Sequence, residues 1–334
     1  MKRFGYLAQA ILLSAAALDA STLVTYPVPT NLENIAVSSG GDLFVTGSFL
    51  DGIIYRISLG GSSQVFGQAP DFALGVAFDT GGNLVVASGT SLYRFQPDGT
   101  RSLITDIAGA QSLNGVTPFS PGVVLVADDG AATVWQVNVN TGSARAWLSG
   151  GLLEPNNDSL PIGPNGVKLF GGAAYITNTG AGTIIRVPIL PDVSAGAPSV
   201  YASGLPLDDF AFGADGSLFL ATQVENSVIR LFPDGTRSIV ATQADGLLGD
   251  SSLAFGRTAA DSQDIYVVNN GGAYENLPGG QRAATVVRLG AGVTGATPEQ
   301  QAIPEPGTLW FGCCGSVLFV MLRVARKRRR SPSY

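Results

Sequence analysis

The chain contains no histidine among its 334 residues, and this absence removes several kinds of chemistry at once. A Ser-His-Asp triad, a Cys-His pair and any histidine-ligated metal site are excluded. The only two cysteines, Cys313 and Cys314, are adjacent and lie near the carboxyl end, so no disulfide bond can form within the preceding part of the chain. The side chains left for chemistry are carboxylates, amides, hydroxyls and a small number of cations.

Charged residues are also scarce, at 13%, and they are unevenly distributed. Of the 19 Lys and Arg, 8 lie at positions 2–3 and 323–330, whereas only Asp19 and Glu305 of the 25 acidic residues lie near the ends. The section between therefore keeps 11 basic and 23 acidic residues, a net charge of about −12, and Lys168 is its only lysine. Such a surface repels nucleic acid and attracts cations, so we expect no nucleic-acid partner.

The amino-terminal segment has the pattern of a secretory signal peptide. Lys2 and Arg3 precede an apolar stretch from Leu7 to Leu18, and the small residues Ala17 and Ala20 follow or close that stretch. We therefore predict a signal peptide over residues 1–20 and export across the inner membrane.

The carboxyl end combines three features in a fixed order. Pro304-Glu305-Pro306 is followed by an apolar run from Leu309 to Leu322 and then by the basic cluster 326–330. The run is shorter than the roughly 20 residues that span a bilayer comfortably, and the basic cluster is expected to stay cytoplasmic. This arrangement resembles the PEP-CTERM sorting tail of exported bacterial envelope proteins.

The resemblance implies a sorting signal over residues 304–330, preceded by a linker over 293–303. It implies processing by an exosortase-type membrane protease, transient anchoring through a short C-terminal transmembrane helix with its end in the cytoplasm, and a final place in the cell envelope or outside the cell. A permanent single-pass anchor that is never cut remains the alternative.

The section over residues 21–292 contains a sixfold repeat. Apolar residues flank one Arg or Gln in each copy, and the copies are Ile54–Ile57, Leu92–Phe95, Val134–Val137, Ile184–Val187, Val228–Leu231 and Val286–Leu289. Two further β-prone runs precede each copy, and an Asp-Gly turn at Asp98-Gly99 and Asp234-Gly235 is typical of a hairpin leading to a fourth strand. Six units of four antiparallel strands predict an all-β, six-bladed β-propeller.

The last unit lacks a fourth strand after Leu289, whereas the β-prone segment from Thr22 to Val28 has no unit of its own. We therefore predict that this N-terminal segment is the outer strand of the last blade and closes the ring, which also covers an exposed sheet edge.

One repeat position, at the start of each predicted inner strand, is rich in oxygen donors. In chain order it holds Glu33, Leu74, Asn114, Asn165, Asp208 and Ser251. In a propeller these positions converge on the mouth of the central channel. Hard oxygen ligands without histidine or cysteine favour calcium, with magnesium or manganese as alternatives.

The blade pattern, Pro164-Asn165-Gly166-Val167, Leu113-Asn114-Gly115-Val116, Leu32-Glu33-Asn34 and Leu207-Asp208 together resemble the gluconolactonase / senescence-marker-protein family of six-bladed propellers. The resemblance implies that Glu33, Asn165 and Asp208 bind one divalent cation. It also implies a catalytic pair, with Asp208 helping to activate water and Asn114 near the substrate, in the hydrolysis of a lactone or related ester. The sequence departs from the family where Asn34 and Asp209 replace its usual glycines.

Three functions remain open from the sequence. The chain is a calcium-dependent lactonase or esterase, a non-catalytic propeller that binds an extracellular polysaccharide or envelope proteins, or a scaffold propeller without a metal. Exposed aromatic side chains, from Trp135, Trp147 or Tyr274, would favour the second. The acidic segment from Glu154 to Ser159 is either a lip over the channel mouth or a plain surface loop.

Overall fold

The computed structural model describes residues 20–47, 51–157 and 159–303. The predicted sorting signal with its transmembrane helix, and the predicted signal peptide apart from Ala20, lie outside the described residues. Within those ranges, no helix is long and apolar enough to cross a membrane.

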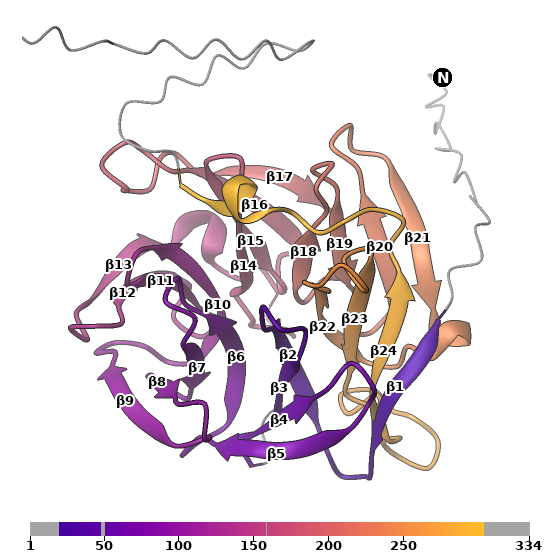
Figure 1. Cartoon of the computed structure of the whole chain (residues 1–334). Coiled ribbons are helices and arrows are strands. Elements are labelled where there is room, and N and C mark those ends of the chain that lie inside the picture. Colours follow the sequence, from indigo (N-terminus) through magenta and orange to yellow (C-terminus); the bar gives the residue numbers. More distant parts are fainter. Residues whose placement is uncertain (1–19, 48–50, 158, 304–334) are drawn as a thin grey trace, which may run out of the picture.

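Six four-stranded antiparallel sheets surround a central axis, which confirms the predicted six-bladed propeller (Figure 1). The inner strands are β2 (Leu32–Val37), β6 (Ala73–Phe78), β10 (Leu113–Ser120), β14 (Pro164–Phe170), β18 (Phe210–Phe212) and β22 (Asp250–Phe255). The second strands are β3 (Leu43–Gly47), β7 (Leu84–Ser88), β11 (Val123–Asp128), β15 (Ala173–Asn178), β19 (Leu218–Ala221) and β23 (Asp264–Asn269). The third strands are β4 (Ile53–Ile57), β8 (Ser91–Phe95), β12 (Thr133–Asn138), β16 (Thr183–Pro188), β20 (Ser227–Leu231) and β24 (Ala284–Gly290). The outer strands are β5 (Ser63–Gln68), β9 (Arg101–Asp106), β13 (Ala144–Ser149), β17 (Ser199–Ser203), β21 (Arg237–Thr242) and β1 (Ser21–Tyr26).

The N-terminal strand closes the ring, as the sequence predicted. β1 pairs antiparallel with β24, with Ser21 opposite Arg288 and Tyr26 opposite Ala284. The first and last strands of the propeller thus share one sheet, and Figure 1 shows them side by side at the same blade. This pairing joins the two ends of the ring without a covalent link.

The hydrophobic core lies between neighbouring blades. One cluster joins the third and fourth blades through Trp147, Ile176 and Ile185, with the rings of Phe119 and Trp147 5.8 Å apart. Burying these apolar faces stabilises the packing of each blade against the next, at roughly 25 cal/mol for each Å² removed from water. The packing fixes the inner strands around the axis.

The polar residue of the sixfold repeat supports the blades and lies away from the axis. Arg56, Arg230 and Arg288 form ion pairs with Asp42, Asp215 and Asp264 respectively, all near the starts of second strands. These side chains are partly exposed, so each pair contributes at most about 1 kcal/mol.

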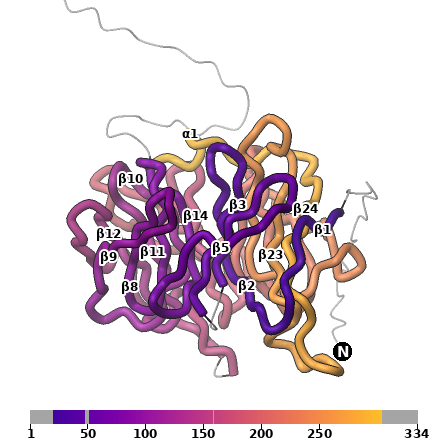
Figure 2. Tube along the Cα trace, turned by 60° about the horizontal axis from the view of Figure 1, so that its bottom comes forward, coloured from indigo at the N-terminus to yellow at the C-terminus, as the bar shows by residue number. Residues whose placement is uncertain are grey.

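The segment after β24, expected to be a loose linker, is instead bound along one face of the propeller. The strap, defined here as Thr294–Gln301, places Ala296 N 2.9 Å from Phe212 O and Gln300 Nε2 2.8 Å from Ala214 O. Its end forms the short helix α1 (Pro298–Gln301), capped by the Thr297 side chain. Figure 2 shows α1 on one face of the disc.

Candidate functional site

One residue at or just before the start of each inner strand lies at the same end of the channel. We call this set the entrance tier: Glu33, Leu74, Asn114, Asn165, Asp208 and Ser251, all of them buried. In five of the six blades the pairing of the inner strand shifts register close to this position, as between Leu32 and Ile35. A register irregularity re-aims the neighbouring side chains. In five of the six blades, the predicted position therefore lies beside an irregularity in the pairing of the first two strands.

Glycine at the next position allows the blades to approach closely. A Cβ on Gly75 would lie 2.0 Å from Asn114 O, and one on Gly115 would lie 2.5 Å from Asn165 O. Any side chain at these two positions would collide with the backbone of the next blade. The glycines that follow Leu74 and Asn114 thus allow neighbouring blades to pack at this close spacing.

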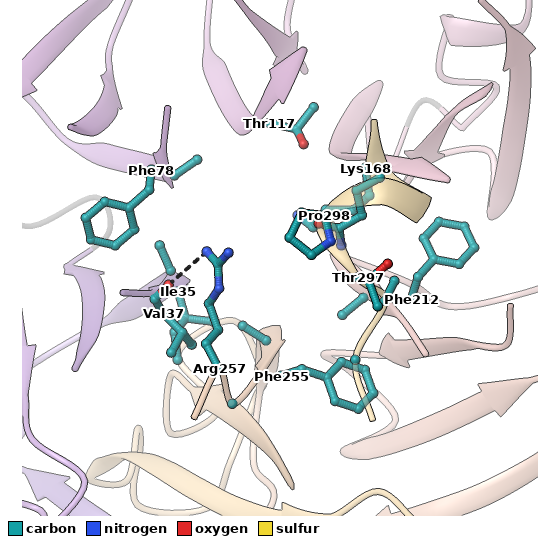
Figure 3. A pocket seen from close by; sticks show the side chains of 18 of the residues that line it. Ile35, Val37, Phe78, Thr117, Lys168, Phe212, Phe255, Arg257, Thr297 and Pro298 are labelled. Atoms are coloured by element: carbon teal, nitrogen blue, oxygen red, sulfur yellow. Dashed lines mark hydrogen bonds between the residues drawn. The ribbon is translucent and has the colours of Figure 1, made fainter. Parts of the chain in front are cut away.

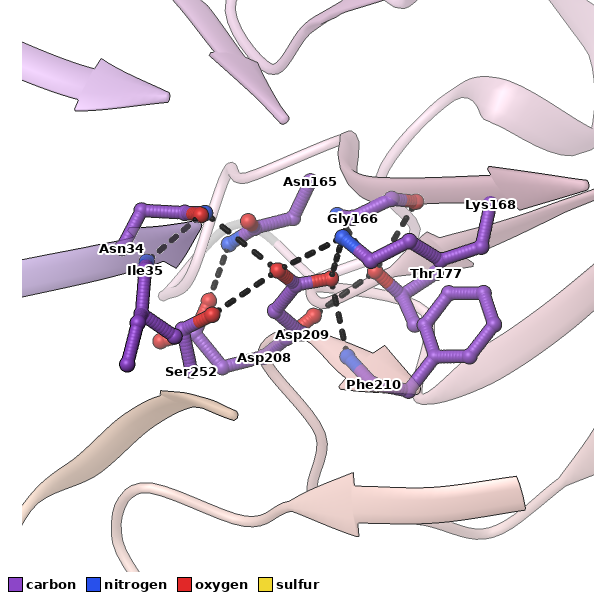
Figure 4. Close-up of polar contacts among 10 residues, drawn as sticks. All are labelled: Asn34, Ile35, Asn165, Gly166, Lys168, Thr177, Asp208, Asp209, Phe210 and Ser252. Atoms are coloured by element: carbon purple, nitrogen blue, oxygen red, sulfur yellow. Dashed lines mark hydrogen bonds and ion pairs between the residues drawn. The ribbon is translucent and has the colours of Figure 1, made fainter. Parts of the chain in front are cut away.

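Three of the predicted site residues meet at the entrance tier. Asn165 Nδ2 donates a hydrogen bond to Asp208 Oδ1, and the Asp208 backbone oxygen accepts from Thr177 Oγ1 at 2.7 Å (Figure 4). Burial, followed by the negative charges of Glu33 and Asp209, holds the pKa of Asp208 well above its usual range. The charge of Glu33 acts on Asp208 strongly because the two carboxylates lie near one another.

Asn114 is placed differently. Its Nδ2 donates to Asp129 Oδ2 at 3.2 Å, and its Oδ1 is buried without a hydrogen-bond partner. Burial raises the pKa of Asp129, against the hydrogen bonds from Ser112 and Asn114. Within the described residues, no hydrogen bond links Asn114 to Asn165 or Asp208. Its free acceptor oxygen is nonetheless part of the same tier.

A second tier lies one residue further along each strand, and sequence reasoning missed its main interaction. Asp209 accepts hydrogen bonds from Asn34 Nδ2 at 3.3 Å and from Ser252 Oγ at 2.9 Å, and forms an ion pair with Lys168 Nζ at 2.8 Å. Figure 4 shows these donors converging on the carboxylate from three other blades. The departures from the family pattern at Asn34 and Asp209, and Lys168 as the single lysine of residues 21–292, were the signals that could have revealed it.

A further buried carboxylate adjoins the entrance tier. Asp250 accepts from Thr222 N at 2.8 Å through Oδ2, whereas its Oδ1 has no hydrogen-bond partner. Burial raises the pKa of Asp250 to about 8. Its charge also contributes to the raised pKa of Asp208, so this carboxylate belongs to the same electrostatic environment.

No group of three or more His, Cys, Asp or Glu side chains is arranged to hold a metal ion within residues 20–47, 51–157 and 159–303. The predicted ligand set, Glu33, Asn165 and Asp208, contains two carboxylates and one amide and is therefore a different kind of group.

The acidic segment before β14 starts at the same end of the channel. Asn178 Nδ2 donates to Leu152 O at 3.0 Å and to Glu154 O at 2.9 Å, which fixes the start of the segment to the fourth blade.

Known proteins resemble the chain in structure only. No protein-family model matches it, and no curated protein matches its sequence. A solved luciferin-regenerating enzyme aligns with a TM-score of 0.67 and 13% identity, over 86% of this chain and 99% of its own. A gluconolactonase from Xanthomonas campestris aligns at 0.64 and 18% identity, over 82% and 90% of the two chains.

A third solved structure is regucalcin, a calcium-binding protein from Agrobacterium tumefaciens, with a TM-score of 0.60 and 17% identity over 85% and 97% of the two chains. The chain shares its fold with these propellers. At such identities the likeness establishes the architecture, and the function rests on this chain's own residues.

Proposed function

We propose that this protein is a divalent-cation-dependent hydrolase of a lactone or related ester, with calcium as the preferred cation. The observation that carries the proposal is the meeting of Glu33, Asn165 and Asp208 from the first, fourth and fifth blades at one end of the channel. The structural likeness to a gluconolactonase and to a calcium-binding propeller supports it.

The donor atoms at the entrance tier fit a hard cation. Carboxylate and amide oxygens are the ligands that calcium and magnesium prefer. Two buried acceptor oxygens there, Asn114 Oδ1 and Asp250 Oδ1, have no hydrogen-bond donor, which is costly unless a positive charge or a donor group approaches them. Burial, followed by repulsion from Glu33 and Asp209, raises the pKa of Asp208, and a bound cation would relieve this repulsion.

Several entrance-tier residues have separate chemical roles in this proposal. Glu33, Asn165 and Asp208 would hold the cation, which polarises a carbonyl oxygen and acidifies bound water when it is present. Asp208 would accept the proton of the attacking water, and the hydrogen bond from Asn165 would orient its carboxylate. Asn114, held by Asp129, would orient the substrate through its free oxygen.

Thermal unfolding of the full chain, with calcium and with chelator, tests the cation site first. We expect calcium to raise the melting temperature of the wild type and to leave Asp208→Ala unchanged, because binding to the folded state alone stabilises it. Asp215→Ala, at a partly exposed ion pair away from the channel, is the matched control and should keep the response. A melting temperature that ignores calcium in the wild type would remove the cation site.

A screen of sugar lactones and simple esters then tests catalysis. We expect calcium-dependent hydrolysis that falls at least 100-fold in Asp208→Asn, because the base is lost, and about tenfold in Asn114→Ala. Calcium binding without hydrolysis of any compound would leave a binding protein.

The aromatic side chains give no support to a carbohydrate-binding surface. Trp147 is buried and its Nε1 donates to Val193 O at 3.0 Å, and Trp135 Nε1 donates to Asp128 Oδ2 at 2.9 Å. Tyr274 is exposed, but its hydroxyl accepts from Asn31. Two of the three candidate platforms are therefore engaged in the propeller itself.

We also propose that the protein is exported, sorted to the cell envelope and cut by an exosortase-type protease, on the sequence features of its two ends. Mass spectrometry of the mature termini from fractionated cells tests this. Full-length chains in the cytoplasm would contradict it.

A further inference from the structure

The opposite end of the channel contains a chamber of about 500 Å³ (Figure 3). We call it the far chamber. Counted with the entrance-tier residue of each blade as the first position, the fourth and fifth positions of all six blades line it, together with part of the strap. None of the residues of the entrance and second tiers lines it. The fourth positions are Ala36, Ala77, Thr117, Lys168, Ala211 and Ala254. Small side chains at five of these six positions leave the space open.

The lining combines apolar and polar side chains. Val37, Phe78, Leu169, Phe212 and Phe255 contribute its larger apolar groups, whereas polar groups come from Thr117, Thr258, Ser262, Thr294, Thr297 and Gln301 besides the two cations described below. The volume is that of a small-molecule site, since such sites occupy about 300–1,000 Å³.

The charge of the far chamber is opposite to that of the protein as a whole. Among the described residues, its lining contains two cations, Lys168 and Arg257, and no carboxylate. The ammonium of Lys168 is neutralised by Asp209. The section that contains the propeller nevertheless has about twice as many acidic as basic residues.

Arg257 supplies the remaining positive charge. Its Nη1 donates to Val37 O at 3.4 Å, and Figure 3 shows its guanidinium extending toward the middle of the chamber. No carboxylate of the described residues forms an ion pair with it. A guanidinium presents five N–H donors in a fork that matches a carboxylate, so most of its donors remain available.

We propose that the far chamber binds a small apolar carboxylic acid, with its anion on Arg257 and its hydrocarbon or aromatic body against the apolar part of the wall around Phe78, Phe212 and Phe255. A neutral apolar compound would leave the guanidinium without its partner. A dianion would place a second charge against walls that contain only one unpaired cation. This site is separate from the entrance tier, and the proposal does not depend on the lactonase activity.

The test uses the full chain and a matched pair of probes, 2-naphthoate and its neutral amide, 2-naphthamide, measured by isothermal titration calorimetry. We expect 2-naphthoate to bind at least tenfold more tightly than 2-naphthamide, since a charge-assisted, bidentate contact favours the anion. Arg257→Gln should weaken 2-naphthoate binding about tenfold and leave 2-naphthamide unchanged. Arg257 is exposed, so its replacement should not disturb folding.

Two further variants fix the location. Arg145→Gln, at an exposed arginine on β13 outside the chamber, should leave binding unchanged. Ala254→Leu fills part of the chamber and should weaken both probes. Asp208→Ala, or a chelator, should leave 2-naphthoate binding unaffected, which separates this site from the proposed cation site. Absence of 2-naphthoate binding, equal affinity for the two probes, or an unchanged affinity in Arg257→Gln would overturn the proposal.

Discussion

The two ends of the channel are built from neighbouring positions on the same six strands, yet their chemistry is opposite. The entrance tier presents buried carboxylates and amides, with acceptor oxygens that lack donors. The far chamber, three residues further along each strand, presents apolar and hydroxyl side chains and a guanidinium without an ion-pair partner among the described residues. A strand rises about 3.3 Å per residue, so three residues separate the two levels by about 10 Å, and one repeat can supply two unrelated binding surfaces.

The ion pair between Asp209 and Lys168 separates these two ends. Asp209 is almost fully buried and belongs to the second tier, while Lys168 also lines the far chamber. The pair cancels one charge of each sign at the boundary. It therefore keeps the excess negative charge at one end and the single unpaired positive charge at the other.

Replacing Lys168 should cause the largest loss of stability among the proposed variants, because it leaves Asp209 without its cation. Lys168→Met leaves Asp209 buried with hydrogen-bond donors but no cation, and loss of one partner of a buried pair costs about 3–5 kcal/mol. Urea unfolding of the full chain measures the change. Arg288→Met, at a partly exposed pair, is the control and should cost at most about 1 kcal/mol.

The double variant Lys168→Met with Asp209→Asn removes both charges of the pair. The amide oxygen can still accept from Phe210 N, and the amide nitrogen can donate to the Ser252 hydroxyl, which can also act as an acceptor. We expect the double variant to recover most of the lost stability. Equal losses in Lys168→Met and Arg288→Met would show that the buried pair has no special role.

The buried carboxyl group of Asp250 should make the stability of the entrance tier depend on pH. Because its folded pKa is raised to about 8, the unfolded chain ionises first, and stability is lost as the pH rises from about 4 to about 8. Asp250→Asn stays neutral and keeps an acceptor for Thr222 N. In the presence of chelator, the free energy of unfolding of Asp250→Asn should exceed that of the wild type by on the order of 1–3 kcal/mol at pH 8. At pH 4 the two free energies should be equal, and urea unfolding at both pH values measures the difference.

Asp215 provides a control of opposite sign. Burial opposes the shift, but hydrogen bonds from Ser217 and Arg230 lower the pKa of Asp215. The ionised Asp215 therefore stabilises the folded state at neutral pH, and this stabilisation is lost as the pH falls. Asp215→Asn should accordingly be less stable than the wild type at pH 8. An Asp250→Asn difference that does not change with pH would contradict the buried-carboxylate interpretation.

The smallest effect is expected at the strap. Thr297→Ala removes the cap of α1, worth about 1 kcal/mol locally. Hydrogen exchange should become about fivefold faster at the amides of Gly171 and Ala296, which bond to or within the strap, while the melting temperature stays unchanged. Unchanged exchange at both amides would mean that other contacts hold the strap.

Much of the fold was predictable because it is periodic. The recurring Arg or Gln of the third strands and the Asp-Gly turns identified the blades, and the missing strand after Leu289 predicted the pairing with β1. The strap was not predictable, because its backbone hydrogen bonds to Phe212 and Ala214 depend on where the chain passes and leave no pattern in Gly, Thr and Pro residues.

The site was predictable only where it follows the repeat. Glu33, Asn165 and Asp208 occupy equivalent positions, so counting along the blades was enough to bring them together. The ion pair of Lys168 with Asp209 joins non-equivalent positions across two blades. The far chamber is a space left by alanines, which in the sequence look like any other core residues.

The course of the strap determines how the molecule would stand on a surface. The described chain ends at the face that holds the far chamber, where Thr297 and Pro298 form part of the wall. A tether attached beyond residue 303 would therefore pull this face toward its support. The carboxylates of the other end would then point to the surrounding medium, open to solutes that arrive from outside, while the chamber would receive only what lies beneath the disc.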